Sequence, residues 1–327
     1  MNQSGVARIC MAVAASGFTL PVWGQPAFPA KTIRIVTLTA AGGSLDIVAR
    51  SVGQKIAEQM GQPVVVENRL GAGGNVGAEV VAKAAPDGYT IGMITSSTHG
   101  VNPTLYGARL PFDAIRDFAP LTLVAELKNV VVVHPSIPAN GAQELAAYAR
   151  ANPNKISFGS AGSGTSQHLA GELFKMQTGI GMQHIPYKGA AQAIPDLLSG
   201  QIQLMFVSIP DVLPHIRSGK LRAIGVTSRE RAGVLPDTVP FAEQGLPEFD
   251  VRAWFGMAAP AGTPRDIVTR YHGEITKALN VAEVKARLSG IGLDPTTSTS
   301  ADQFAAFIRQ EIAKWAPVVK ASGATAD

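Results

Sequence analysis

Short runs of β-branched residues alternate with segments of helical spacing along most of this chain, and glycine-rich turns separate them. The first example is an apolar run over 32–38, a glycine-rich turn, and a segment over 44–60 with apolar residues every third or fourth position. The order strand, helix, strand repeats through residue 95 and starts again near residue 130. It predicts an α/β fold with parallel sheets and helices on both faces.

The pattern divides into two units. Strands are expected over 32–38, 64–66, 89–95, 130–133, 156–160, 183–187 and 202–207, and helices over 44–60, 75–85, 142–151, 166–178 and 190–198. The run 221–227 predicts a strand that returns toward the first unit. Beyond residue 260 the spacing predicts helices over 264–279, 281–289 and 301–322. Because these helices have no sheet of their own, we expect them to pack on the first unit, so that the second unit is an insertion.

The first residues predict export. Arg8, the apolar run 9–20 and the small residues around Val22-Trp23-Gly24 are typical of a signal peptide over 1–24. The only cysteine, Cys10, lies in this segment, so no disulfide or thiolate metal site is expected in the mature protein. The six histidines lack ligand spacing, and we expect neither a metal nor a cofactor. The net charge of +4 comes from scattered lysines and arginines, which do not indicate a nucleic-acid partner.

Two loops rich in glycine and hydroxyl groups follow predicted strands and precede predicted helices. They cover residues 39–46 and 159–168. A strand, a glycine-rich turn and a helix N-terminus together form a binding site for an anion, because free N–H groups and the helix dipole point toward it. Two such loops predict one anion that is held from two sides.

Each loop also has a simpler interpretation. The first can be an ordinary strand-to-helix turn with Ser44 as N-cap. Asp46, near the start of this helix, is expected to position the loop, because it would repel an anion. The second loop can be a surface turn, and His168 is expected to be a buried structural residue that donates to a carbonyl.

Other motifs give little support for catalysis. The chain lacks a Gly-x-Ser-x-Gly segment and a His-Glu-x-x-His segment, so we predict that it is not an enzyme. A secreted hydrolase with Ser166 as nucleophile is the alternative. Segment 71–77 departs from the dinucleotide-binding pattern by one position, and a close-packed turn is the better interpretation. Trp254 and Phe255 are expected to pack at a hinge rather than to contact a ligand.

Several longer strings resemble one family. They are VVVENR at 64–69, GAGGN at 71–75, AAPDGYT at 84–90, GTSQHLAGELF at 164–174, IPYKG at 185–189 and LPHI at 213–216. Together they resemble the Bug family, the periplasmic solute-binding proteins of tripartite tricarboxylate transporters, across essentially the whole mature chain. The resemblance implies a type II periplasmic-binding fold, in which a hinge joins two Rossmann-like lobes with the ligand cleft between them. It also implies that the two loops hold a carboxylate, partly through ordered water.

The chain departs from the pattern of this family around the cleft. Thr39 stands where an aromatic residue is usual, Leu45 where a hydroxyl is usual, and Val207 where an acidic residue is usual. An acidic residue at the last position would pair with a ligand ammonium, so its loss predicts a carboxylate without an amino group.

The chain is expected to form two lobes that bind one ligand. The first lobe comprises residues 25–125 and 250–327, and the second lobe residues 126–249. The protein is expected to be a periplasmic monomer that captures a di- or tricarboxylate or an aromatic carboxylate and delivers it to a membrane permease. An orphan sensor that presents the carboxylate to a membrane kinase is the alternative. The predicted ligand-binding residues are Thr39, Ala41, Gly43, Ser44, Asp46, Ser97, Ser160, Gly162, Gly164, Thr165, Ser166 and Ser208.

Overall fold

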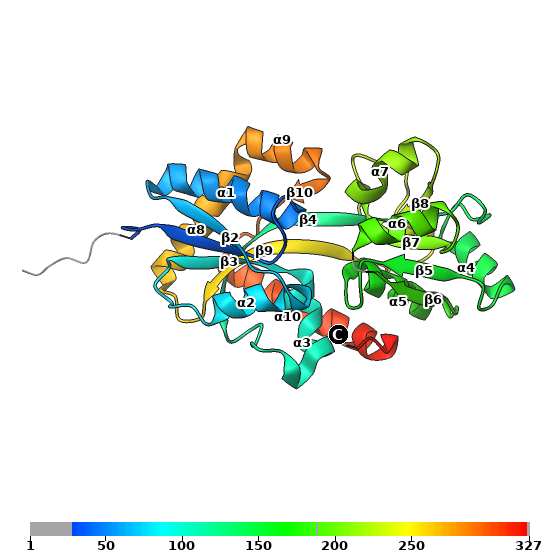
Figure 1. Ribbon diagram of the computed structural model, residues 1–327, viewed down its shortest axis with the longest axis horizontal. Helices are drawn as coiled ribbons and strands as arrows, with labels where there is room; N and C mark the ends of the chain where they lie inside the picture. Colours follow the sequence, from blue (N-terminus) through cyan, green and yellow to red (C-terminus); the bar gives the residue numbers. More distant parts are fainter. Residues whose placement is uncertain (1–27, 188, 326–327) are drawn as a thin grey trace, which may run out of the picture.

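One mixed sheet runs through the whole molecule. A computed structural model describes residues 28–187 and 189–325, so the predicted signal peptide lies outside the described residues. The strands follow one another across the sheet in the order β2 (Val64–Asn68), β1 (Ile33–Thr37), β3 (Thr90–Thr95), β9 (Arg252–Pro260), β4 (Phe118–Val133), β7 (Leu204–Ser208), β5 (Ser157–Ser160) and β6 (Gln183–Pro186). Two further strands, β8 (Arg222–Val226) and β10 (Leu293–Pro295), also pair with β4. Figure 1 shows a group of helices and strands at each end of the two long central strands, β4 and β9. The molecule therefore has the two-lobed α/β architecture that the sequence predicts.

The strand β4 (Phe118–Val133) joins the two ends of the sheet. Its residues up to Lys128 pair antiparallel with β9 (Arg252–Pro260), and from Asn129 onward the strand pairs with β7 and β8 instead. The sequence predicted only the part of β4 over 130–133 and did not predict β9. The change of partner marks the place where the chain passes from one lobe into the other.

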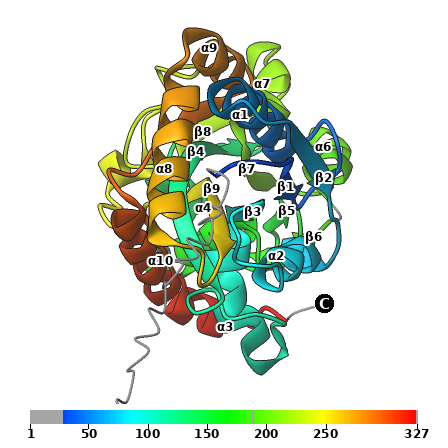
Figure 2. The same cartoon turned by 90° about the vertical axis from the view of Figure 1, so that its left-hand side faces the viewer.

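The first lobe is built on β1 (Ile33–Thr37), β2 (Val64–Asn68), β3 (Thr90–Thr95), β9 and the first half of β4. The core on one face of this sheet includes α1 (Ser44–Met60), α8 (Arg265–Asn280) and α9 (Ala282–Gly290). The core on the other face includes α2 (Asn75–Ala82) and the first turns of α10 (Ala301–Ser322). Figure 2, viewed toward this lobe, shows the helices around the sheet.

The second lobe is built on β5 (Ser157–Ser160), β6 (Gln183–Pro186), β7 (Leu204–Ser208), β8 (Arg222–Val226) and the second half of β4. One face packs against α4 (Ala142–Ala151) and α5 (Ser166–Thr178), and the other against α6 (Ala190–Leu198) and α7 (Ile209–Arg217). The short elements α3 (Asn102–Tyr106) and β10 (Leu293–Pro295) complete the fold. Helices α1, α4, α5, α6 and α10 begin and end where the sequence predicts, because amphipathic spacing is a local signal.

Two expectations about the connections between the lobes are wrong. The strand at 221–227 does not return to the first lobe, because β8 pairs with Val130–Val133 of β4 inside the second lobe. The last helix does not pack on the first lobe alone. Its residues Trp315, Val318 and Val319 lie in the core of the second lobe, whereas Phe304 lies in the core of the first. The lobe boundaries at 125 and 250 stay a prediction.

Candidate functional site

A cavity of about 280 Å³ lies between the two lobes. The parallel strands β1 and β3 of the first lobe and β5 and β7 of the second end beside it, as expected for a site at the carboxyl ends of parallel strands. Its hydroxyl-bearing lining residues are Thr39, Thr95, Ser96, Ser97, Thr165, Ser166 and Ser208, and its larger apolar ones are Leu38, Leu127 and Phe255. Among the described residues that line the cavity, none carries a charged side chain.

A larger hollow of about 770 Å³ lies within the second lobe, beside β8. Its lining comes from residues 135–244 and includes neither glycine-rich loop. The smaller cavity is therefore the candidate ligand site, because among the hollows of the described residues it is the one lined by both glycine-rich loops, through Thr39 of the first and Ala161, Thr165, Ser166 and Gln167 of the second.

The second glycine-rich loop brings the N-terminus of α5 to the cavity. Thr165 is the N-cap, and its hydroxyl accepts from the His168 amide at 3.3 Å. The amides of Ser166 and Gln167, next in the chain, have no hydrogen-bond partner within the described residues. Free N–H groups at a helix N-terminus favour a bound anion.

Two other amides of this loop, those of Gly162 and Gly164, already have hydrogen-bond partners and are not free to bind an anion, contrary to the expectation for this loop. The Gly162 amide donates to the Ser160 hydroxyl at 3.2 Å, and the Gly164 amide donates to Nδ1 of His168 at 3.1 Å. Gly164 has a positive φ of 74°, and a Cβ there would lie 2.5 Å from Leu105 in α3. The amides of these glycines are therefore used within the loop, and neither glycine lines the cavity.

Two stacked histidines support this loop from behind. The rings of His168 and His184 lie 3.8 Å apart, and Nε2 of His184 lies 2.7 Å from the Ser160 hydroxyl. Burial lowers the pKa of His168 to about 3 and that of His184 to about 4, so both rings are neutral near pH 7. His168 is thus a structural residue, but it accepts from an amide and does not donate to a carbonyl as expected.

The buried side chain of Asn129 connects two hydroxyl groups of the cavity. Its Nδ2 donates to Oγ of Ser166 at 3.2 Å, and its Oδ1 accepts from Oγ of Ser208 at 3.3 Å. Nε2 of Gln167 also lies 3.4 Å from the Ser208 hydroxyl. Among the described residues, no histidine bonds to Ser166, so the arrangement differs from a serine–histidine nucleophile.

The first glycine-rich loop encloses the carboxylate of Asp46. This buried carboxylate accepts from the Gly42 amide at 2.9 Å, from Nε of Arg50 at 2.9 Å and from Nδ2 of Asn68 at 2.8 Å. Burial alone would raise the pKa of Asp46, but these hydrogen bonds lower it below its ordinary value. Asn68 also donates to the Thr39 carbonyl at 2.8 Å. Asp46 therefore positions the part of the loop that reaches the cavity.

Some of the predicted ligand-binding residues line the cavity and others do not. Thr39, Ser97, Thr165, Ser166 and Ser208 line the cavity. Ser44 lines a different hollow of about 580 Å³ between the lobes, and it is the first residue of α1, with Gly43 as the N-cap. The residues Ala41, Gly43, Asp46, Ser160, Gly162 and Gly164 do not line the cavity.

The interpretation of Val207 needs correction. Its side chain is fully buried in the core of the second lobe, with Val130 and Val132 of β4. Because side chains alternate along a strand, the next residue, Ser208, faces the cavity instead. The nature of residue 207 therefore does not determine directly which ligands fit.

Some residues of the site were not predicted from the sequence. Asn129 was not identified, although a single polar residue at the start of a buried valine run is a detectable signal. Of the two aromatic residues expected at a hinge, Trp254 is buried in the core, whereas Phe255 lines the cavity. Gly73 and Gly74 of the segment interpreted as a close-packed turn also reach the cavity.

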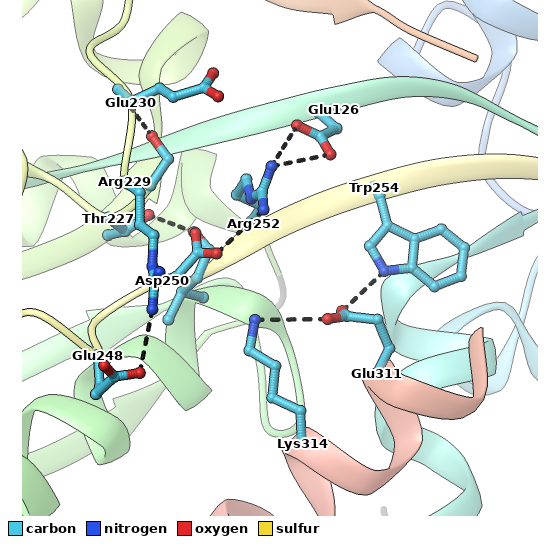
Figure 3. Close-up of polar contacts among 12 residues, drawn as sticks. Glu126, Thr227, Arg229, Glu230, Glu248, Asp250, Arg252, Trp254, Glu311 and Lys314 are labelled. Carbon is cyan, nitrogen blue, oxygen red and sulfur yellow. Dashed lines mark hydrogen bonds and ion pairs between the residues drawn. The ribbon is translucent and has the colours of Figure 1, made fainter. Parts of the chain in front are cut away.

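Polar contacts surround the strands that cross between the lobes (Figure 3). Arg252, the first residue of β9, pairs with Glu126 of β4 and with Asp250, each at 3.1 Å. Glu311 of α10 accepts from the indole nitrogen of Trp254 at 2.9 Å. Polar contacts therefore link β9 to its neighbour β4 in the sheet and to the last helix, α10.

Comparisons with known proteins agree with this geometry. Residues 48–324 match the family described as tripartite tricarboxylate transporter family receptor. The chain is 36% identical to protein BugT of Bordetella pertussis, with 99% of each chain covered. It is similar to the structure of Rhodopseudomonas palustris Rpa4515 with adipate (32% identity, TM-score 0.79, 91% and 99% covered). It is also similar to MatC from Rhodopseudomonas palustris with bound malate (32% identity, TM-score 0.76, 89% and 100% covered).

Within residues 28–187 and 189–325, none of the helices combines the length and the apolar character that crossing a membrane requires.

Proposed function

The chain belongs to the family of tripartite tricarboxylate transporter receptors, and we propose that it captures an organic carboxylate in the cavity between its lobes. The observation that carries this proposal is the N-terminus of α5, where the free amides of Ser166 and Gln167 and the Ser166 hydroxyl meet at the cavity. A carboxylate placed there would accept from all three groups and would interact favourably with the helix dipole.

The opposite wall supports a ligand with a second polar group. Thr39, Ser96 and Ser97 of the first lobe lie across the cavity, and Leu127 and Phe255 supply apolar surface between the lobes. Adipate and malate, which the two similar structures hold, are both dicarboxylates. We therefore favour a small dicarboxylate. Because no acidic side chain lines the cavity among the described residues, we also favour a ligand without an ammonium group.

Capture would serve transport. The two lobes would close on the carboxylate and exclude water, which strengthens its hydrogen bonds. The closed monomer, exported to the periplasm, would then deliver the carboxylate to the membrane components of a tripartite tricarboxylate transporter.

Calorimetric titration tests this proposal. Adipate, malate, succinate and benzoate are titrated into the purified protein, with succinamide as a neutral control. We expect at least one carboxylate to bind and succinamide not to bind. Ser166→Ala should weaken the binding by about tenfold, because one hydrogen bond to a charged group is lost. If no carboxylate binds, the proposal is wrong.

A further inference from the structure

Resting on the proposed carboxylate site, we infer that Asn129 is a positioning residue that directs the Ser166 hydroxyl proton toward the ligand. The Asn129 side chain makes two hydrogen bonds, one to the hydroxyl of Ser166 and one to the hydroxyl of Ser208. Asn129 is fully buried, and no part of it lines the cavity. It therefore acts on a ligand only through the groups it contacts.

The polarity of these hydrogen bonds distinguishes the two serines. Ser166 accepts from the Asn129 amide, so its own proton is free, and within the described residues no protein group accepts it. Ser208 donates its proton to Asn129 and accepts from Gln167. The cavity wall thus presents a donor at Ser166, and the proton of Ser208 is already used. A donor at this position favours a ligand group that accepts, and a carboxylate offers two charged acceptor oxygens where an amide offers one neutral oxygen.

The main chain of Asn129 is fixed where the lobes connect. Its carbonyl accepts from the amide of Thr227 at 3.0 Å, and the Thr227 hydroxyl donates to the Val251 carbonyl at 2.6 Å. The amide of Val251 donates back to Thr227 at 2.8 Å. These bonds join β4 to the segments that follow β8 and precede β9. Asn129 therefore has a fixed backbone from which its side chain can orient Ser166.

Selectivity between a carboxylate and its amide tests the inference. Adipate or malate, whichever binds more tightly to the wild-type protein, is compared with its diamide. In Asn129→Asp the new carboxylate can only accept, so the Ser166 proton turns toward residue 129 and away from the ligand. We expect the affinity for the dicarboxylate to fall by about 10- to 100-fold while the affinity for the diamide changes little or rises. Equal losses for both ligands would overturn the inference.

A double-mutant cycle supplies a test without the added charge. Asn129→Ala should weaken dicarboxylate binding in the wild-type background by about tenfold but in a Ser166→Ala background by less than about twofold. Thr227→Val is the matched control, because it removes a buried hydroxyl beside Asn129 and leaves Ser166 untouched. It should lower the melting temperature and keep the ratio of dicarboxylate to diamide affinity.

The outcomes separate the two proposals. If the wild-type protein binds no carboxylate, the proposed function is wrong and the role of Asn129 is overturned with it. If the wild-type protein binds a dicarboxylate, but the effects of Asn129→Ala and Ser166→Ala are additive, only the role of Asn129 is overturned.

Discussion

Trp254 of β9 and Trp315 of α10 donate their indole N–H groups to one carboxylate, that of Glu311, at 2.9 and 3.1 Å. Trp254 lies in the core of the first lobe and Trp315 in the core of the second. All three side chains are buried. The carboxylate of Glu311 therefore connects the cores of the two lobes. Its helix, α10, lies more than 100 residues after the second glycine-rich loop in the chain.

The first prediction concerns this connection. Glu311→Leu leaves two buried indole N–H groups without their acceptor, so we expect the free energy of unfolding to fall by about 2–6 kcal/mol. Urea denaturation, followed by circular dichroism, measures this change. Glu248→Ala is the control, because Glu248 is largely exposed and its ion pair with Arg229 lies on the surface. An equal effect of both substitutions would contradict the prediction.

The second prediction concerns the carboxylate that the first loop encloses. Asp46→Asn removes the charge that Arg50, Gly42 and Asn68 stabilise, and we expect a loss of about 1–3 kcal/mol in the free energy of unfolding at pH 7. Dicarboxylate binding should weaken as well, because the loop carries Thr39 to the cavity. Urea denaturation and calorimetry measure the two effects.

The lowered pKa of Asp46 determines how its contribution to the free energy of unfolding changes with pH. Because the folded pKa lies below the ordinary value, this stabilisation is present above the ordinary pKa of an aspartate and is lost as the pH falls through the folded pKa. The difference between wild type and Asp46→Asn should therefore be constant from pH 5 to pH 8. Asp302→Asn, which changes an exposed ion pair with Arg265, should have little effect on ligand binding.

Local signals explain which parts of the fold the sequence could predict. The helices α1 and α10 were predicted because apolar residues recur on one face of each. The strand β9 and the first half of β4 were missed, because Arg252 and Lys128, far apart in the sequence, pair only in the folded sheet. A strand with few β-branched residues is stabilised by such partners more than by its own propensity.

The site, like the fold, could be predicted only in part. Hydroxyl groups after strands predicted a site between the lobes, and Ser97, Ser166 and Ser208 do line the cavity. The sequence could not show that His168 and Asp46 occupy loop amides, because these bonds depend on loop conformation. The two loops are therefore unequal. The second presents free amides to the cavity, and the first encloses a carboxylate of its own.

The third prediction concerns stability at acid pH. Burial lowers the pKa of His99 and His168 to about 3 and that of His184 to about 4, far below the value of an unfolded histidine. The unfolded chain therefore binds more protons between about pH 3 and pH 6.5, and stability falls as the pH decreases through this range. Each histidine should contribute a loss of about 2 kcal/mol between pH 7 and pH 5. Urea denaturation at both pH values measures the sum, and equal stability at the two would contradict the prediction.

The fourth prediction concerns ligand selectivity and follows from the orientation of β7. Ser208→Asp places a carboxylate on the cavity wall, where it can pair with a ligand ammonium. We expect the affinity for aspartate relative to succinate to rise by about tenfold, as for one charge-assisted hydrogen bond. Calorimetric titration of both ligands gives this ratio.

Val207→Asp is the matched comparison, because it adds the same carboxylate one residue earlier, inside the core of the second lobe. It should destabilise the protein strongly, since it buries an unpaired charge, and should not raise the ratio. A ratio that rises with Val207→Asp and not with Ser208→Asp would show that residue 207, not residue 208, faces the ligand.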